Sequence, residues 1–291
     1  VRSGAAEALG YLRAYTAEYS LIAALDSPHP VVRQEAATAL AWCGGRESVS
    51  PLISTLDDEE WIVRAAAWAS LTNVTGNLFP FDARAKQDER MRQAGAWREW
   101  WIDVEADATP VDGLALTRCE DLSAKLRGAR ALGALSGADS APDVTETLMV
   151  IVDKYADQGN TTITRIESHL MQAAIQSLGR LKNPHSLPTM LALLEKESWA
   201  RYAAMALGEF GSPEAVKPLI RAYPRYARDL SNRRGKGNLH NPALCPIDDR
   251  YSGDNTQDRM HETPYCILYA LCRLRIESPR DRGLLRDITP H

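Results

Sequence analysis

Helical phrases that are rich in alanine and end on a leucine recur along the chain. Residues 29–44 (HPVVRQEAATALAWCG) and residues 1–12 (VRSGAAEALGYL) share alanines at matching positions and an arginine seven places before a leucine. Their apolar residues follow helical spacing, which predicts a helix in each segment. The marker leucine first recurs every 31 residues, at Leu9, Leu40 and Leu71. The arginine keeps the same spacing, at Arg2, Arg33 and Arg64.

Looser versions of the phrase follow, and each has a different kind of helix before it. The later marker leucines are Leu132, Leu178, Leu207 and Leu271. The preceding helices have apolar residues at helical spacing and turn residues on both sides. We expect them over residues 20–28, 48–58, 145–155, 187–198 and 214–228. The unit is therefore a helix A, a turn, a helix B that carries the leucine, and a second turn.

The pattern resembles the HEAT repeat, in particular the short bacterial HEAT-like repeat of the phycobilisome-lyase type. The resemblance is carried by VRSGAAEAL at 1–9 and VRQEAATAL at 32–40, whereas residues 63–71 depart from it at Trp68 and Ser70. It implies an all-α solenoid, a superhelix of about seven helical pairs over residues 1–291, because one pair cannot bury its apolar stripe without neighbours. Since residues 1–12 match a helix B without its helix A, we expect the protein to continue upstream.

The repeated arginines have acidic residues at a fixed distance. Asp26 precedes Arg33 by seven residues, and Asp57 precedes Arg64 by seven. This spacing predicts a ladder of ion pairs that ties the turns of adjacent units together. An exposed pair contributes only about 0–1 kcal/mol, so leucine packing must dominate the stability. We interpret these arginines as structural.

Composition narrows the functional classes. The chain of 291 residues is 45% apolar and 25% charged, with a net charge of −4, which is ordinary for a folded protein and gives no sign of a nucleic-acid surface. No apolar run approaches the length of a membrane span. The five cysteines are odd in number and lack a Cys-x-x-Cys pair, so we expect mostly buried thiols and no disulfide framework.

A first interruption of the repeat covers residues 74–112. A helix expected over residues 84–103 places Trp97, Trp100 and Trp101 on one face. The segment resembles an insert of bacterial HEAT-like proteins that ends in Trp-Arg-x-Trp-Trp. Two interpretations stay open: a plug that covers a gap in the stack, or a platform on which Trp97 and Trp101 bind a sugar or peptide.

A second interruption covers residues 229–257, and long loops in compact domains are often functional. Its first part is basic with tyrosines, and its second part is acidic. The candidate binding residues around it are Arg225, Arg228, Arg233, Arg234, Lys236, His240, Tyr251 and His261. The basic part could contact phosphate or an acidic partner, and the two parts could also pair with each other. A weaker alternative is a calcium site at Asp248, Asp249, Asp254 and Asn255, without EF-hand spacing.

Catalytic and metal-binding motifs are absent from the sequence. HETPY at 261–265 lacks the second histidine of a zinc protease helix, and there is no G-x-S-x-G elbow or phosphate-binding loop. We therefore expect no catalytic residue, metal or cofactor, and we predict a non-catalytic scaffold that binds a protein partner rather than nucleic acid or a membrane. The resemblance allows two alternatives: an accessory region of a larger bacterial enzyme such as an oxidoreductase, with residues 229–262 near its active site, or a bilin lyase-like role.

Overall fold

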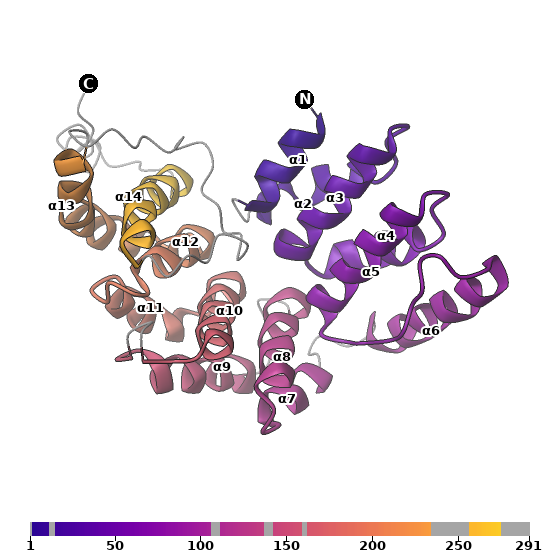
Figure 1. The fold of residues 1–291 in the computed structure, drawn as a ribbon. Helices are drawn as coiled ribbons and strands as arrows, with labels where there is room; N and C mark the ends of the chain where they lie inside the picture. Colours follow the sequence, from indigo (N-terminus) through magenta and orange to yellow (C-terminus); the bar gives the residue numbers. More distant parts are fainter. Residues whose placement is uncertain are drawn as a thin grey trace. The chain divides into compact units, whose positions relative to one another are not determined.

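The computed structural model describes residues 2–11, 15–105, 111–136, 142–158, 162–233 and 256–274. Every regular element in these ranges is a helix, so the all-α prediction is confirmed for them. The helices form two compact units: α1 to α8 make unit 1, and α9 to α14 make unit 2 (Figure 1). One continuous solenoid over residues 1–291 stays a prediction.

The expected helices A and B are present in both units. The repeated phrase forms α1 (Arg2–Tyr11), α3 (Pro30–Cys43), α5 (Trp61–Thr75), α8 (Leu122–Leu135), α10 (Arg165–Leu181), α12 (Ala200–Phe210) and α14 (Thr256–Arg273). The predicted helices A are α2 (Glu18–Ala24), α4 (Arg46–Thr55), α9 (Pro142–Tyr155), α11 (Leu187–Leu193) and α13 (Val216–Arg233). Short 3₁₀ turns precede three of them: Tyr15–Ala17, Pro184–Ser186 and Pro213–Ala215.

Two helices lie within and just after the first interruption, and the sequence predicts one of them. The tryptophan-rich helix is α6 (Gln87–Glu105), which begins three residues later than the expected start at residue 84. The second helix, α7 (Val111–Arg118), was not expected. Eight residues are too few for apolar periodicity to stand out, and such a helix depends on tertiary packing. That packing is against α8, where Gly113 lies against the side chain of Leu132.

Within each unit the helices B stack side by side, and helices A form a second layer. In unit 1 the order of contact is α1, α3, α5 and α8, and in the second layer α2 contacts α4, which contacts α6 (Figure 1). In unit 2 the order is α10, α12 and α14. Leu9 is partly buried, and the other six marker leucines are buried: Leu40, Leu71, Leu132, Leu178, Leu207 and Leu271. Each contributes about 1.5–3 kcal/mol of hydrophobic stabilisation, so these seams hold the stacks together.

Small residues let neighbouring helices B approach closely, at a fixed place next to the marker leucine. A glycine directly after the marker leucine of one helix B faces an alanine directly before the marker leucine of the next helix B. The pairs are Gly10 with Ala39, Gly179 with Ala206, and Gly208 with Ala270. A Cβ atom on any of these glycines would lie 2.8–2.9 Å from the Cα atom of the facing alanine. Between α3 and α5 the equivalent residue is Ser70, whose hydroxyl donates to the carbonyl oxygen of Ala37 at 2.6 Å. The alanine-rich phrase therefore encodes the spacing of the stack.

The second interruption is shorter than expected. Residues 229–233 continue α13, and residues 256 and 257 already belong to α14. The sequence explains the extension of α13, because no glycine or proline occurs between Pro224 and Gly235. Residues 234–255 lie outside the described ranges.

Candidate functional site

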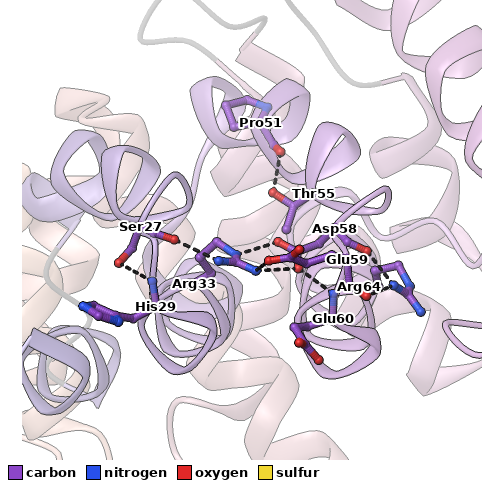
Figure 2. Close-up of polar contacts among 9 residues, drawn as sticks. All are labelled: Ser27, His29, Arg33, Pro51, Thr55, Asp58, Glu59, Glu60 and Arg64. Carbon is purple, nitrogen blue, oxygen red and sulfur yellow. Dashed lines mark hydrogen bonds and ion pairs between the residues drawn. The ribbon is translucent and has the colours of Figure 1, made fainter.

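The turns between helices A and B in unit 1 are joined by arginine side chains (Figure 2). Arg33, in the first turn of α3, binds the carboxylate of Asp58 in the next turn along the stack. The distances are 2.7 Å from Nε to Oδ2 and 2.9 Å from Nη2 to Oδ1. Its Nη1 donates to the carbonyl oxygen of Ser27 at 2.9 Å, and Nη2 also lies 3.3 Å from the carboxylate of Glu59. One guanidinium therefore connects two consecutive turns.

Arg64 holds the same place in α5 but makes different contacts. Its Nη1 donates to the carbonyl oxygens of Asp58 and Glu59, in the turn just before it. Its Nε and Nη2 donate to the carbonyl oxygen of Ala83 at 2.9 and 2.6 Å. Arg64 therefore connects its own turn to the segment that follows α5.

That segment, residues 77–86, is called the strap. Gly76 ends α5 in the left-handed conformation, with φ of 76°, and the chain then runs back along the helix. The indole N–H of Trp68 donates to the carbonyl oxygen of Phe79 at 2.9 Å, and the guanidinium of Arg84 lies 3.7 Å from the ring centre of Trp61. Arg64 therefore hydrogen-bonds to the strap, whereas Arg33 hydrogen-bonds to the next turn of the stack.

Both arginines are buried, with 7% of Arg33 and 6% of Arg64 exposed. Hydrogen bonding to Asp58 raises the pKa of Arg33 above its ordinary value, whereas burial lowers the pKa of Arg64. Arginine in proteins keeps its charge across the accessible pH range, so both guanidiniums act as permanent cations.

The predicted acidic partners of the two arginines are wrong. Arg33 pairs with Asp58 rather than with Asp26, which is exposed. Arg64 binds carbonyl oxygens, and Asp57 pairs instead with Arg98 of α6. The seven-residue spacing describes one turn only, whereas stacking brings the acid of the following turn within reach of Arg33.

The tryptophans of α6 pack into the interior of unit 1. Ring centres lie 5.2 Å apart for Phe79 and Trp97 and 6.1 Å apart for Trp97 and Trp100, in edge-to-face arrangements. Trp97 is fully buried, and Trp101 is 5% exposed beside the guanidinium of Arg46. The indole N–H groups of the three tryptophans have no acceptor among the residues that the structure describes. A platform formed by Trp97 and Trp101 is therefore wrong, since protein atoms already cover both rings.

The candidate residues of the second interruption are only partly described. Arg225 is exposed on α13 and pairs with Glu195 at 2.8 Å. Arg228 and Arg233 lie in α13 and His261 lies in α14, but their side chains are outside the described part. The other candidates lie outside the described ranges altogether: Arg234, Lys236, His240 and Tyr251. The four residues of the alternative calcium site, 248, 249, 254 and 255, also lie there. A binding role for this segment stays a prediction.

Four of the five cysteines lie in the described ranges. Cys43 and Cys266 are buried thiols, whereas Cys119 and Cys272 are exposed. The expectation of mostly buried thiols is therefore met by two of these four cysteines. Within the described ranges, no group of three or more His, Cys, Asp or Glu side chains has the arrangement of a metal site. No helix in those ranges is both long enough and apolar enough to cross a membrane.

An exposed apolar group lies on the same turns as the arginine network. Val31 is 58% exposed in the first turn of α3, and Trp61 and Ile62 are 42% and 38% exposed in the first turn of α5. Val31 and Ile62 are both the second residue of their helix, and Arg33 connects the two turns. We call the surface formed by Val31, Trp61 and Ile62, together with the exposed Glu59 and Glu60, the turn surface.

Sequence reasoning missed the turn surface, although a signal was present. Val31 and Ile62 lie outside the apolar stripe that ends on the marker leucine. An apolar residue outside this stripe does not face the other helix of its own helical pair. The same second position in α8 holds Ser123, which is polar and exposed. The repeat does not need an apolar side chain there.

Comparisons with known proteins identify the repeat. The family model for HEAT repeats matches residues 1–72 and 167–230, so the chain carries HEAT repeats in both units. The narrower resemblance to the phycobilisome-lyase type stays a prediction. No curated protein matches the chain.

Two crystal structures of engineered proteins are similar to the chain at low identity. One is 15% identical with a TM-score of 0.27, over 86% of this chain and 96% of that one. The other is 16% identical with a TM-score of 0.33, over 98% of this chain and 77% of that one.

Proposed function

We propose that the chain is a non-catalytic scaffold that binds another protein, and that the turn surface of unit 1 is part of the binding site. The observation that carries the proposal is the exposure of Val31, Trp61 and Ile62 on two adjoining turns. Apolar groups gathered on a surface mark interaction sites, and tryptophan is enriched in protein interfaces.

The turns that present these side chains are held rigidly. Arg33 fixes one turn to the next through Asp58, and Arg64 fixes the second turn to the strap. A surface that is ordered before binding loses less conformational entropy when a partner docks. The arginine network therefore supports the proposal by keeping the apolar side chains at a constant separation.

The experiment is capture of a partner from extracts of the source cells by the immobilised full chain. The test variant is Val31→Ser with Ile62→Ser, which copies the residue that α8 carries at the same position. Its control is Val150→Ser on α9, where a valine is 63% exposed in unit 2. We expect the double variant to weaken capture by roughly tenfold or more and the control to leave it unchanged. Equal capture by all three proteins would show that the turn surface is not the site.

The charged residues of the second interruption are a second proposed contact for the same function. Reversing two of their charges, with Arg233→Glu and Arg234→Glu, removes part of the basic run without touching the turn surface. Loss of the captured partner in this variant alone would place the contact near the end of α13. Capture that is unaffected would remove the segment from the proposed site.

A further inference from the structure

We infer that the segment bound by the turn surface is cationic and aliphatic, a stretch of a partner chain in which lysine or arginine alternates with leucine, isoleucine or valine. The inference rests on the proposed function and specifies its partner.

The apolar part of the surface is a pair of equivalent sites. Val31 and Ile62 occupy the same position in α3 and α5, which pack side by side. Neighbouring helices lie about 8–10 Å apart, so the two side chains present aliphatic contacts at that interval, with the ring of Trp61 beside the second one. Alternate residues of an extended segment lie about 6.6–6.8 Å apart, somewhat less than this interval, so two aliphatic side chains of one segment reach both sites by leaning apart.

The charge that a partner can reach beside these sites is negative. The run Asp57 to Glu60 carries four carboxylates directly before Trp61. Arg33 occupies Asp58, and Arg98 neutralises Asp57. Glu59 keeps 78% of its side chain exposed and meets Arg33 only at 3.3 Å, and Glu60 is exposed as well.

Two of the three arginines that border these turns, Arg33 and Arg64, are withdrawn from a partner. Arg33 and Arg64 are more than nine-tenths buried and donate to protein acceptors. Arg84 is exposed, but its guanidinium lies on the ring of Trp61. The exposed carboxylates of Glu59 and Glu60 therefore outnumber the one exposed guanidinium of Arg84, and complementary charge beside them selects a basic partner.

Synthetic peptides test this inference on the full chain. The probes are three short peptides with identical leucine and valine positions and lysine, serine or glutamate at all other positions. Binding is followed by fluorescence anisotropy of a labelled peptide. We expect the lysine peptide to bind roughly tenfold more tightly than the serine peptide, the glutamate peptide to bind most weakly, and the lysine advantage to shrink at high salt.

Charge variants of the protein sharpen the test. Glu59→Lys with Glu60→Lys is expected to reverse the order of the peptides, and Glu59→Gln with Glu60→Gln to remove the preference. The control makes the same change of net charge on exposed residues of unit 2, with Glu197→Lys and Glu214→Lys. It is expected to keep the order of the wild type. A thermal melt of each variant verifies the fold.

Three outcomes would overturn the inference: equal binding of the three peptides, preference for glutamate, or binding of none. They are separate from failure of the proposed function. If Val31→Ser with Ile62→Ser abolishes partner capture while Glu59→Lys with Glu60→Lys does not, the scaffold function stands and the cationic partner is wrong. If the serine variant leaves capture unchanged, the proposed function itself has failed.

Discussion

Arg33 and Asp58 form a bidentate ion pair that connects two consecutive turns of unit 1. The two residues are 25 apart in sequence, with most of a repeat between them. Both side chains are nearly buried, at 9% and 10% exposure. Because Asp58 also accepts the backbone N–H of Glu60 at 2.9 Å, the pair fixes the start of α5 as well as the stacking of α5 on α3.

Removal of this carboxylate should be costly. Asp58→Ala leaves the guanidinium of Arg33 nearly buried without its anion, and breaking a buried pair from one side costs about 3 kcal/mol. The neighbouring Asp57→Ala is the matched control, since Asp57 and Arg98 are about half exposed and such pairs contribute about 0–1 kcal/mol. Urea unfolding of the two variants measures the difference. An equal loss of stability in both would show that the Arg33–Asp58 pair does not hold the stack.

The glycines at the seam should not tolerate a methyl group. In Gly179→Ala the new Cβ would lie 2.7 Å from the carbonyl oxygen of Ala206 and 2.8 Å from its Cα atom, and both are backbone atoms that cannot move alone. Overpacking of this kind costs about 1–3 kcal/mol. Gly95→Ala in α6 meets no atom within 4 Å and should instead stabilise the protein by about 0.5–1 kcal/mol. Thermal unfolding distinguishes the two signs, and a stabilised Gly179→Ala would contradict the close approach of α10 and α12.

The local pattern of the sequence was sufficient for the helices B and most helices A. The burial of Leu40 and Leu178 follows from apolar periodicity, which is a property of each helix alone. The acidic partner of Arg33, in contrast, depends on how one helical pair stacks on the next. The spacing of residues within one turn carries no information about this stacking. The same limit explains why α7 was missed, because its eight residues gain their stability from α8.

The candidate site was harder to predict than the fold. Tryptophans on one helix face, such as Trp97 and Trp101, have the same pattern whether they bind a ligand or fill a core. Only the position of α6 against α4 decides between the two. Val31 and Ile62 could have been found by asking which apolar residues have no place on the stripe of their own helix.

The capping box of α10 should make stability depend on pH. Thr164 donates its backbone N–H to the carboxylate of Glu167 at 2.9 Å and its hydroxyl at 2.7 Å. These bonds, the backbone bond first, lower the pKa of Glu167 below its ordinary value of 4.5. The lowered pKa means that the contribution is present above about pH 4.5 and is lost as the pH falls through the pKa of the folded state.

Thr164→Ala tests this contribution. The substitution removes the cap and should cost about 1 kcal/mol at pH 7. The cost should shrink in acid, where Glu167 is protonated in the wild type as well. Urea unfolding of both proteins between neutral pH and pH 3 gives the dependence. The backbone N–H of residue 164 still donates to Glu167 in the variant, so a difference in stability that stays constant down to pH 3 would show that the Thr164 hydroxyl takes no part in lowering the pKa of Glu167.

The tryptophans of unit 1 should separate into a structural and a surface class. Trp97 is fully buried against Phe79 and Trp100, so Trp97→Ala should cost about 3–5 kcal/mol through the cavity that it leaves. Trp97→Phe keeps an aromatic ring and loses no indole hydrogen bond, so it should leave a smaller cavity and cost clearly less than Trp97→Ala. Trp61→Ala removes an exposed ring from the turn surface and should change the free energy of unfolding by only about 0.5 kcal/mol. Urea unfolding gives all three values, and acrylamide should quench Trp61 fluorescence far more than that of the α6 cluster. A large loss of stability in Trp61→Ala would mean that this ring supports the fold, which would weaken its place in a binding surface.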